Sequence, residues 1–357
     1  MSSELPQILG LREIQRFKSA WERLAAGHAS PAQHYAWAEA FAATYWEYGS
    51  VVVLHAGPED DPTALAPLVR PHAGGALEAL GARQLFEPTD FLYDNEEALG
   101  ALARLLRARG EALHVSRIPE DSPAVGALYR AFRGQGLVRV VATDAYPVLD
   151  LDESWRDPEQ HLNARRRSDF RRARRRAGRF GAPSFELRFP TPRELPALLD
   201  QAWLIEGAGW KGKAGSALQY DRRRGAFFRR FAAAAAARGI LRLAFMRIGE
   251  RAVAMQLAVE SDERLWLLKI GYDERYAACS PGQQLMSYSV AMAARRGLKS
   301  IEFLGEQEPW TRLWTEKARR CVALRAYPLT RRGVRVLASN AMRYAARRAA
   351  LLTPAFG

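Results

Sequence analysis

The residues best suited to chemistry lie in the segment 279–285, which reads CSPGQQL. It stands between an apolar run that predicts a strand and a stretch that predicts an amphipathic helix. Ser280 is predicted to cap that helix, Pro281 suits its first turn, and Gln283 is placed to complete a capping box. Gly282 adds no side chain, so the amides of this residue and of the two glutamines after it could approach an anion at the positive end of the helix dipole. The segment predicts either an anion-binding turn or only a well-capped helix.

The elements around this turn follow a definite order in the second half of the chain. Periodicity predicts a strand, two helices, three strands joined by tight turns, a helix, a strand, a short helix and a last strand. The predicted ranges are 185–190, 193–205, 222–237, 240–248, 252–259, 264–272, 282–296, 299–304, 309–318 and 321–327. The three central strands are expected to form an antiparallel meander, and the turn follows the third of them.

This order resembles the core of the GNAT acyltransferase superfamily, in which the corresponding turn holds the pyrophosphate of coenzyme A. Short motifs also look like the CelD-like, FemABX-related branch, which is often associated with cell-envelope or exopolysaccharide synthesis. The residues that carry this resemblance are Gly271, Tyr272, Asp273, Tyr276, Ser280, Pro281, Gly282, Leu285, Phe303, Leu304, Gly305, Glu306 and Trp314. The resemblance covers residues 146–327 and implies acetyl-CoA or another acyl-CoA as co-substrate.

The resemblance also implies where the coenzyme binds. The implied coenzyme-binding residues are Ile270, Gly271, Ser280, Pro281, Gly282, Gln283, Gln284 and Leu285. Main-chain amides of the strand near 268–271 are candidates to polarise the thioester carbonyl. No nucleophile with its base is visible, so direct transfer to an amine or hydroxyl is expected rather than a covalent intermediate.

Polar residues on otherwise apolar elements are candidates for the acceptor site. Acylation of an amine needs a base to take a proton from the ammonium, and Glu302 and Glu306 are the candidate catalytic residues, acting directly or through water. The alternative is that these carboxylates are solvated or paired with arginines. The candidate substrate-binding residues are Trp203, Trp210, Gln256, Lys269 and Trp314, although core packing explains the tryptophans equally well.

The chain departs from the branch pattern after residue 306. The branch usually shows an aromatic residue, a lysine and, three residues further, a tryptophan, whereas residues 310–314 read WTRLW. Arg312 would leave a helix about 100° away from the missing lysine. Trp310 has no titratable proton that could replace the tyrosine many GNAT enzymes use as general acid. A non-catalytic protein that binds coenzyme A or an anionic surface is therefore an alternative to an enzyme.

The length of 357 residues favours two domains. The first half predicts helices and strands in an order that nearly repeats the second half. Their ranges are 12–24, 35–46, 51–56, 65–70, 76–80, 96–109, 112–117, 122–133 and 137–143. We therefore expect an α/β (α+β) protein with two tandem GNAT-like domains, each a mixed, mostly antiparallel sheet flanked by helices. They are a degenerate domain at 1–145 and an acyltransferase domain at 146–330, followed by a basic helix at 331–357. The loop 81–94 has no Ser-Pro-Gly turn, so the first domain is expected to bind no coenzyme.

The net charge of +14 is concentrated in two segments. Residues 165–179 carry nine arginines and one acid, and residues 319–357 carry nine arginines and no acid, so the rest of the chain sums to −3. The first segment is either a solvated helix joining the two domains or a site for an anionic partner. Coenzyme phosphates, an anionic membrane surface and tRNA would each fit. FemABX relatives use aminoacyl-tRNA as donor, which makes an aminoacyl-tRNA-dependent transferase the enzymatic alternative.

The C-terminal basic segment has helical spacing. One stripe holds Arg331, Arg335, Arg343 and Arg347, and the opposite stripe holds Val334, Leu337, Ala338, Ala341 and Ala345. The apolar stripe is expected either to pack against the protein or to lie on an anionic membrane surface.

Cysteine and histidine usage predicts neither a disulfide framework nor a metal site. Cys279, beside a helix N-terminus, is either a packing residue or a nucleophile. The segment 1–6 lacks the order of a signal peptide, and no run of about 18 apolar residues is present. A cytoplasmic protein is expected, at most peripheral at the inner face of the membrane.

Overall fold

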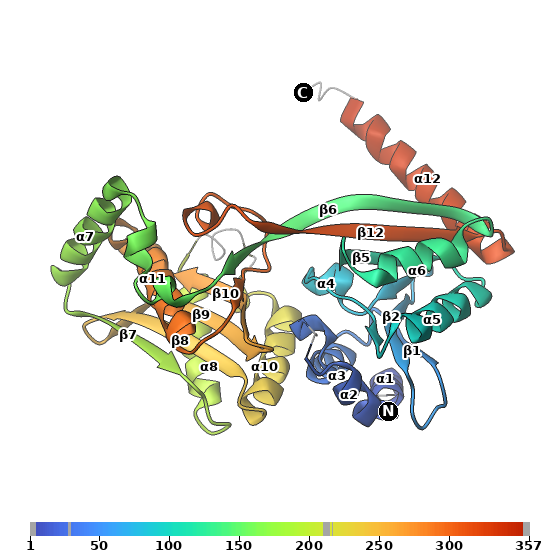
Figure 1. Cartoon of the computed structure of the whole chain (residues 1–357), viewed down its shortest axis with the longest axis horizontal. Coiled ribbons are helices and arrows are strands. Elements are labelled where there is room, and N and C mark those ends of the chain that lie inside the picture. The colour runs from blue at the N-terminus through green and yellow to red at the C-terminus, as the bar shows by residue number, and fades with distance from the viewer. Residues whose placement is uncertain (1–4, 28–29, 210–214, 216, 353–357) are drawn as a thin grey trace. The chain divides into compact units, whose positions relative to one another are not determined.

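The computed structural model describes residues 5–27, 30–209, 215 and 217–352, which form two compact units (Figure 1). Unit 1 comprises Met1–Asp144 and Arg320–Gly357, and unit 2 comprises Ala145–Arg319. Each is a layered α/β structure in which helices flank a mixed, mostly antiparallel sheet, as the sequence predicts.

Unit 1 begins with helices and then forms its sheet. Its elements are α1 (Leu5–Gln15), α2 (Lys18–Leu24), η1 (Pro31–Gln33), α3 (Tyr35–Thr44), β1 (Gly49–Ala56), β2 (Ala64–Pro71), β3 (Leu77–Ala79), α4 (Ala82–Leu85), β4 (Leu92–Tyr93), α5 (Glu96–Ala108), β5 (Leu113–Pro119), α6 (Pro123–Phe132), the start of β6 (Gly136–Asp150), most of β12 (Ala318–Pro328) and α12 (Arg331–Leu352). The strand order is β1-β2-β3-β5-β12, and β4 pairs with β2. The β3–β5 pair is parallel and the other pairs are antiparallel.

The core of unit 1 forms because α5 and α6 are amphipathic. Leu99, Leu102 and Leu106 recur on one face of α5 and pack with Leu128 and Phe132 of α6 in one apolar cluster that includes strand residues. Burying such side chains stabilises the unit by roughly 1.5–3 kcal/mol each.

Unit 2 contains the remaining elements. They are the end of β6, η2 (Glu153–Arg156), η3 (Pro158–His161), α7 (Ala164–Gly178), β7 (Pro183–Arg188), α8 (Leu195–Gly207), α10 (Arg222–Ala237), β8 (Leu241–Ile248), β9 (Arg251–Ser261), β10 (Arg264–Tyr272), η4 (Glu274–Cys279), α11 (Pro281–Arg295), β11 (Ser300–Glu302) and η5 (Thr311–Leu313). The strand order is β7-β8-β9-β10-β11-β6, in which only the β10–β11 pair is parallel.

The two sheets share one topology. In each unit three antiparallel strands lead into a helix, α5 or α11, and the next strand lies parallel to the third. The last strand comes from elsewhere in the chain, since β6 pairs with β11 and β12 pairs with β5. Residues 320–330, which we expected in the second domain, therefore lie in unit 1, because pairing with β5 holds the strand there.

Two predicted helices are wrong in extent. The helix predicted at 12–24 begins at Leu5 and is interrupted after Gln15, because Phe17 is buried with a non-helical backbone. The helix predicted at 309–318 is only the single turn η5. There Thr311 closes a tight turn by bonding to the main chain of Glu308, and Thr315 donates to the Val148 carbonyl.

Candidate functional site

The N-terminus of α11 is not capped in the way the sequence suggests. Ser280 has φ 45° and ψ 50°, in the left-handed region, and its side chain makes no capping hydrogen bond. The predicted capping box is therefore wrong. The 3-10 helix η4 ends at Cys279 and α11 begins at Pro281, so the backbone of Ser280 is held between the two.

Two amides remain unused at this helix end. The Gln284 amide donates to the Ser280 carbonyl at 3.1 Å, so it is not available to a ligand as predicted. The amides of Gly282 and Gln283 donate no hydrogen bond within the described part of the chain. They lie at the positive end of a fifteen-residue helix that has no acid in its first turn, which is an arrangement that attracts anions.

The two glutamine side chains fix the surroundings of these amides. The Gln283 Oε1 atom accepts from Trp314 Nε1 at 3.1 Å, and its Nε2 atom donates to the Trp310 carbonyl at 3.5 Å. The Gln284 Nε2 atom donates to the Cys279 carbonyl at 2.7 Å. Gln284 is only 3% exposed and its Oε1 atom has no partner, so a donor is missing from this buried position.

A pocket of about 330 Å³ opens beside this helix end. Its lining residues come from α7, the start of α11 and the segment around η5, and they are Arg166, Asp169, Phe170, Ala173, Ser280, Gln283, Gln284, Pro309, Trp310 and Leu313. Asp169 is paired with Arg172 at 2.6 Å. Arg166 makes no ion pair among the described residues, so the pocket combines an unpaired cation, unused amides and an aromatic wall.

The arginine-rich helix α7 forms one wall of this pocket. Phe170, Ala173 and Ala177, at spacings i, i+3 and i+7, are buried, and Arg176 donates to the Ala278 carbonyl at 3.3 Å. The helix is therefore part of unit 2, and the interpretation of it as a connector between domains is wrong. The sequence offers the arginines of 165–179 as a site for coenzyme phosphates without singling out Arg166, and it does not predict Phe170 as a pocket residue, although the apolar spacing within the arginine run is the signal for a packed face.

The strands β10 and β11 pair over a short stretch only. Pairing between β10 and β11 covers only 264–266 with 300–302, and β10 carries an irregularity between Leu267 and Lys269. Ile270, like Trp310 and Leu313, packs against the apolar cluster that contains Phe170 and Trp314. A Cβ atom on Gly271 would lie 2.7 Å from the Cα atom of Glu206, so the close approach of α8 explains this glycine.

Other implied coenzyme residues have structural roles. Leu285 is fully buried, in a cluster with Cys279, and Pro281 is buried. Burial raises the pKa of the Cys279 thiol, which opposes formation of a thiolate. Cys279 is thus a packing residue, which is one of the two roles that the sequence suggests for it.

The two candidate bases differ in access. Glu302 is 0% exposed; its Oε1 atom accepts from the Ser300 hydroxyl at 3.0 Å and lies 3.5 Å from an Arg319 nitrogen, while its Oε2 atom has no hydrogen-bond partner. Glu306 is exposed and makes no ion pair within the described residues. The structure therefore seals one carboxylate and leaves the other open to an acceptor.

The candidate substrate-binding residues do not form one site. Gln256 contacts Ser289 and Met286 of α11, whereas Lys269 lies over the ring of Phe228 in α10. These two therefore point to opposite faces of the sheet, since Gln256 pairs with residue 270 rather than 269.

The three tryptophans among these candidates are also dispersed. Trp203 is buried in α8, beneath Arg229. Trp314 is buried against Phe170, which lines the pocket. Trp210 lies outside the described residues.

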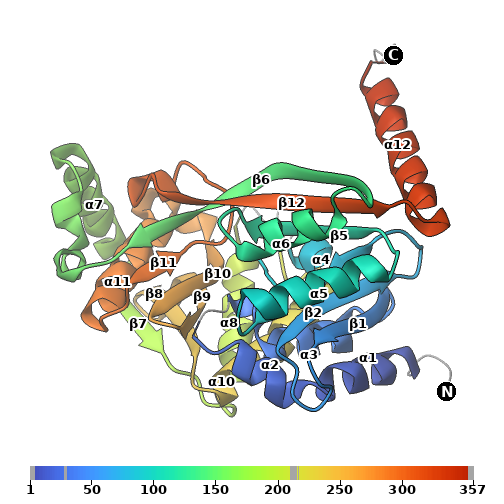
Figure 2. The ribbon, with the colours of Figure 1, turned by 45° about the vertical axis from the view of Figure 1, so that its right-hand side comes forward.

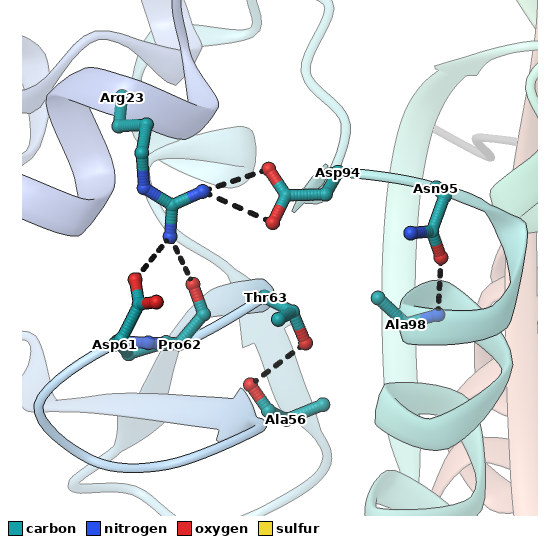
Figure 3. Close-up of polar contacts among 8 residues, drawn as sticks. All are labelled: Arg23, Ala56, Asp61, Pro62, Thr63, Asp94, Asn95 and Ala98. Carbon is teal, nitrogen blue, oxygen red and sulfur yellow. Dashed lines mark hydrogen bonds and ion pairs between the residues drawn. The ribbon is translucent and has the colours of Figure 1, made fainter.

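The equivalent helix end in unit 1 is closed. In Figure 3 the Asn95 side chain caps α5, accepting from the Ala98 amide at 2.9 Å. Glu96 and Glu97 occupy its first turn. Arg23 bonds to both Asp94 oxygens at 2.8 and 3.0 Å and holds the preceding loop. The carboxylates repel an anion and the cap uses an amide, so this end is unsuited to phosphate.

One family model matches part of the second half of the chain. Residues 164–312 match the family model described as Acetyltransferase (GNAT) domain, a segment that begins with α7 and contains the uncapped turn. No curated relative matches the sequence. The narrower likeness to the CelD-like branch remains a prediction.

Solved structures share the fold over more of the chain. FemX has a TM-score of 0.56 at 12% identity, covering 88% of this chain and 96% of its own. L-PGS from Bacillus licheniformis has a TM-score of 0.53 at 10% identity, covering 92% and 95%. The C-terminal DUF2156 domain of a protein described as a lysylphosphatidylglycerol synthetase from Agrobacterium fabrum has a TM-score of 0.55 at 11% identity, covering 88% and 92%. At these identities the likeness shows the fold alone.

No helix within the described ranges is long and apolar enough to cross a membrane. The same residues contain no group of three His, Cys, Asp or Glu side chains placed to hold a metal ion.

Proposed function

We propose that unit 2 transfers an acyl group from acetyl-CoA or another acyl-CoA to an amine or hydroxyl acceptor. The observation that carries this proposal is the uncapped start of α11, where two unused amides lie in a first turn without an acidic residue and a pocket of about 330 Å³ lies alongside. The family match over the same residues supports the class of reaction. The resemblance to the CelD-like branch favours an acceptor on a cell-envelope or exopolysaccharide precursor.

The residues present fit a coenzyme with a pyrophosphate. The amides of Gly282 and Gln283 would donate to phosphate oxygens, and Arg166 would add a charge-assisted bond. The unpartnered Gln284 Oε1 atom would accept from an amide or hydroxyl of the bound molecule. Trp310 and Phe170 supply an apolar wall that excludes water from part of the pocket.

The transfer step requires groups that hold the thioester carbonyl oxygen and a base that accepts a proton from the acceptor. The bound coenzyme supplies an activated acyl group as its thioester. The main chain of β10 beyond Trp266, where β11 no longer pairs with it, would hold the carbonyl oxygen. Glu306 is the better placed of the two candidate bases, since Glu302 is sealed beside arginine. The raised pKa of Cys279 favours direct transfer over a thioester on the protein.

A second candidate function is transfer of an aminoacyl group from aminoacyl-tRNA. It is favoured by the exposed arginines of α7 that make no ion pair within the described residues, namely Arg165, Arg166, Arg171, Arg175 and Arg179. Such a row beside the pocket would suit a phosphodiester backbone.

The experiment that separates these functions is native mass spectrometry followed by an activity assay. The protein is sprayed as purified, then with acetyl-CoA and with aminoacyl-tRNA. We expect one acetyl-CoA per chain and release of free coenzyme thiol when an amine acceptor is added. Retention of tRNA without acetyl-CoA binding would support the second candidate, and coenzyme binding without turnover on any acceptor would support a non-catalytic role.

A further inference from the structure

The C-terminal helix α12 has two faces with different surroundings. Its start is anchored to the rest of unit 1: Gly333 donates to the Thr330 hydroxyl at 3.1 Å, and that hydroxyl donates to the Gly110 carbonyl at 2.6 Å. A Cβ atom on Gly333 would lie 2.1 Å from the Pro328 carbonyl oxygen, so the helix approaches the chain closely there. In Figure 2 α12 leaves the end of β12 as a separate rod.

The anchored face continues for two turns. Val336 and Leu337 pack against a small cluster of Ala76, Ala112 and Tyr327. Asn340 donates to the Tyr327 hydroxyl at 3.0 Å. Positions 333, 336, 337 and 340 follow the spacing of one helix face, and this face fixes the orientation of the helix.

The opposite face carries an exposed apolar stripe. We call it the α12 stripe, and it consists of Val334, Ala338, Ala341, Met342 and Ala345. These residues follow the spacing i, i+4, i+7, i+8 and i+11 and are all exposed, Val334 by 51% and Met342 by 68%. Of the predicted stripe of Val334, Leu337, Ala338, Ala341 and Ala345, Leu337 packs against the protein and the other four residues are exposed.

Positive charge borders the α12 stripe. Arg331 and Arg335 lie seven and three residues before Ala338, which places them on the same side of the helix at the N-terminal end of the stripe, and neither makes an ion pair within the described residues. Residues 319–357 contain nine arginines and no acid, so no neighbouring carboxylate in the segment offsets them. An exposed apolar stripe edged by unpaired arginines complements a surface that is apolar below and negative at its boundary.

We propose that α12 docks on an anionic phospholipid bilayer, lying in the interface with the α12 stripe toward the acyl chains and Arg331 and Arg335 among the headgroups. The rigid anchoring of its first turns means that docking orients unit 1 on the membrane. No spanning segment is required, because an interfacial helix binds through partial insertion and charge.

The test is sedimentation of the full chain with vesicles of phosphatidylglycerol and phosphatidylcholine, or of phosphatidylcholine alone. We expect binding only to the anionic vesicles, weakening as salt rises. Arg331→Gln with Arg335→Gln should lower the partition coefficient about 25-fold, since each basic residue near such a surface contributes about fivefold. Val334→Ser with Met342→Ser should lower it several-fold, and Met342→Trp should raise it.

A matched control changes the same charge elsewhere. Arg165→Gln with Arg171→Gln removes two unpaired arginines from α7, and we expect vesicle binding to stay unchanged. Equal loss in this control would show a nonspecific charge effect and overturn the proposal. So would unchanged binding in both α12 variants. Loss of a dimer on light scattering in Val334→Ser with Met342→Ser would instead assign the stripe to a second copy of the chain.

Discussion

The starts of α5 and α11 occupy the same place in two sheets of the same topology, yet only one is open to a ligand. At α5, Asn95 caps the helix and Glu96 and Glu97 fill the first turn. At α11, Ser280 makes no cap and the first turn holds no acid. The difference lies in a few side chains, because each helix lies in the connection between two strands that pair in parallel, β3 and β5 or β10 and β11.

The two helix starts show that the side chains that stabilise a helix end differ from those that leave it open to a ligand. An Asn cap and acids near the N-terminus satisfy amides and the helix dipole, each stabilising the helix by roughly 0.5–1 kcal/mol. The helix α11 lacks these contributions and holds Ser280 in a left-handed conformation, which costs about 1–3 kcal/mol. The start of α11 is therefore the less stable of the two and the one that can accept phosphate.

The largest expected effect comes from making α11 resemble α5. Gly282→Glu places a carboxylate at the second helical position, where Glu97 stands in α5. Like charges about 4 Å apart repel by roughly 4 kcal/mol near a protein surface, so acetyl-CoA affinity should fall more than 100-fold in calorimetric titration. The melting temperature should not fall, because glycine is a poor helix former and an acid suits this end.

The mirrored substitution is the control for that variant. Glu97→Gly should lower the free energy of unfolding by about 1 kcal/mol and leave acetyl-CoA affinity unchanged. A Gly282→Glu protein that folds and still binds acetyl-CoA normally would show that the start of α11 is only the beginning of a helix.

The second prediction concerns a histidine of unit 1 that makes the free energy of unfolding depend on pH. Burial, and then the nearby Arg325 cation, lower the pKa of His114 to about 4 from an ordinary value near 6.5. The folded state thus favours neutral His114. The free energy of unfolding that this preference contributes is fully present above pH 6.5 and is lost as pH falls toward 4. We expect the unfolding free energy to fall by about 2 kcal/mol more in the parent than in His114→Gln over this range. Parallel pH curves for the two proteins would contradict this.

Arg166 should contribute less than the α11 amides. Arg166→Gln removes one charge-assisted bond to phosphate, and we expect acetyl-CoA affinity to fall about tenfold and its salt dependence to become shallower. Arg165→Gln, one position away and outside the pocket, is the matched variant and should change affinity little. A similar loss in both variants would point to general attraction by α7.

The smallest effects test the caps themselves. Asn95→Ala should lower the unfolding free energy by about 1 kcal/mol through loss of the bond to the Ala98 amide. Ser280→Ala should leave it nearly unchanged, because the Ser280 side chain makes no capping bond. Chemical denaturation of both variants measures the difference, and an equal loss would mean that Ser280 caps α11 after all.

The sequence predicts elements with strong local periodicity well. The ranges of α10 and β10 agree with the predicted 222–237 and 264–272, since alanine-rich helical spacing and an apolar run between turns leave few alternatives. The location of the turn at 279–285 between strand and helix is also confirmed.

The remaining features depend on contacts that are distant in sequence. The backbone conformation of Ser280 is determined by η4, a short 3-10 helix that leaves little periodic pattern in the sequence. The pairing of β12 with β5 joins residues about two hundred positions apart. The pocket wall formed by α7 arises because Phe170 and Ala173 pack toward the turn. The many arginines around these two residues made the apolar spacing hard to recognise in the sequence. The irregularity in β10 places the side chains of Gln256 and Lys269 on opposite faces of the sheet.

The most direct test of the central claim is hydrogen exchange read by mass spectrometry, with and without acetyl-CoA, comparing the starts of α11 and α5. Peptides that contain Gly282 and Gln283 should exchange more slowly when acetyl-CoA is present, because their unused amides become bonded to phosphate. Peptides that contain Glu96 to Ala98 should exchange at the same rate in both conditions. Equal protection at both helix starts, or no protection at Gly282 and Gln283 while acetyl-CoA is bound, would contradict the assignment of the coenzyme to α11.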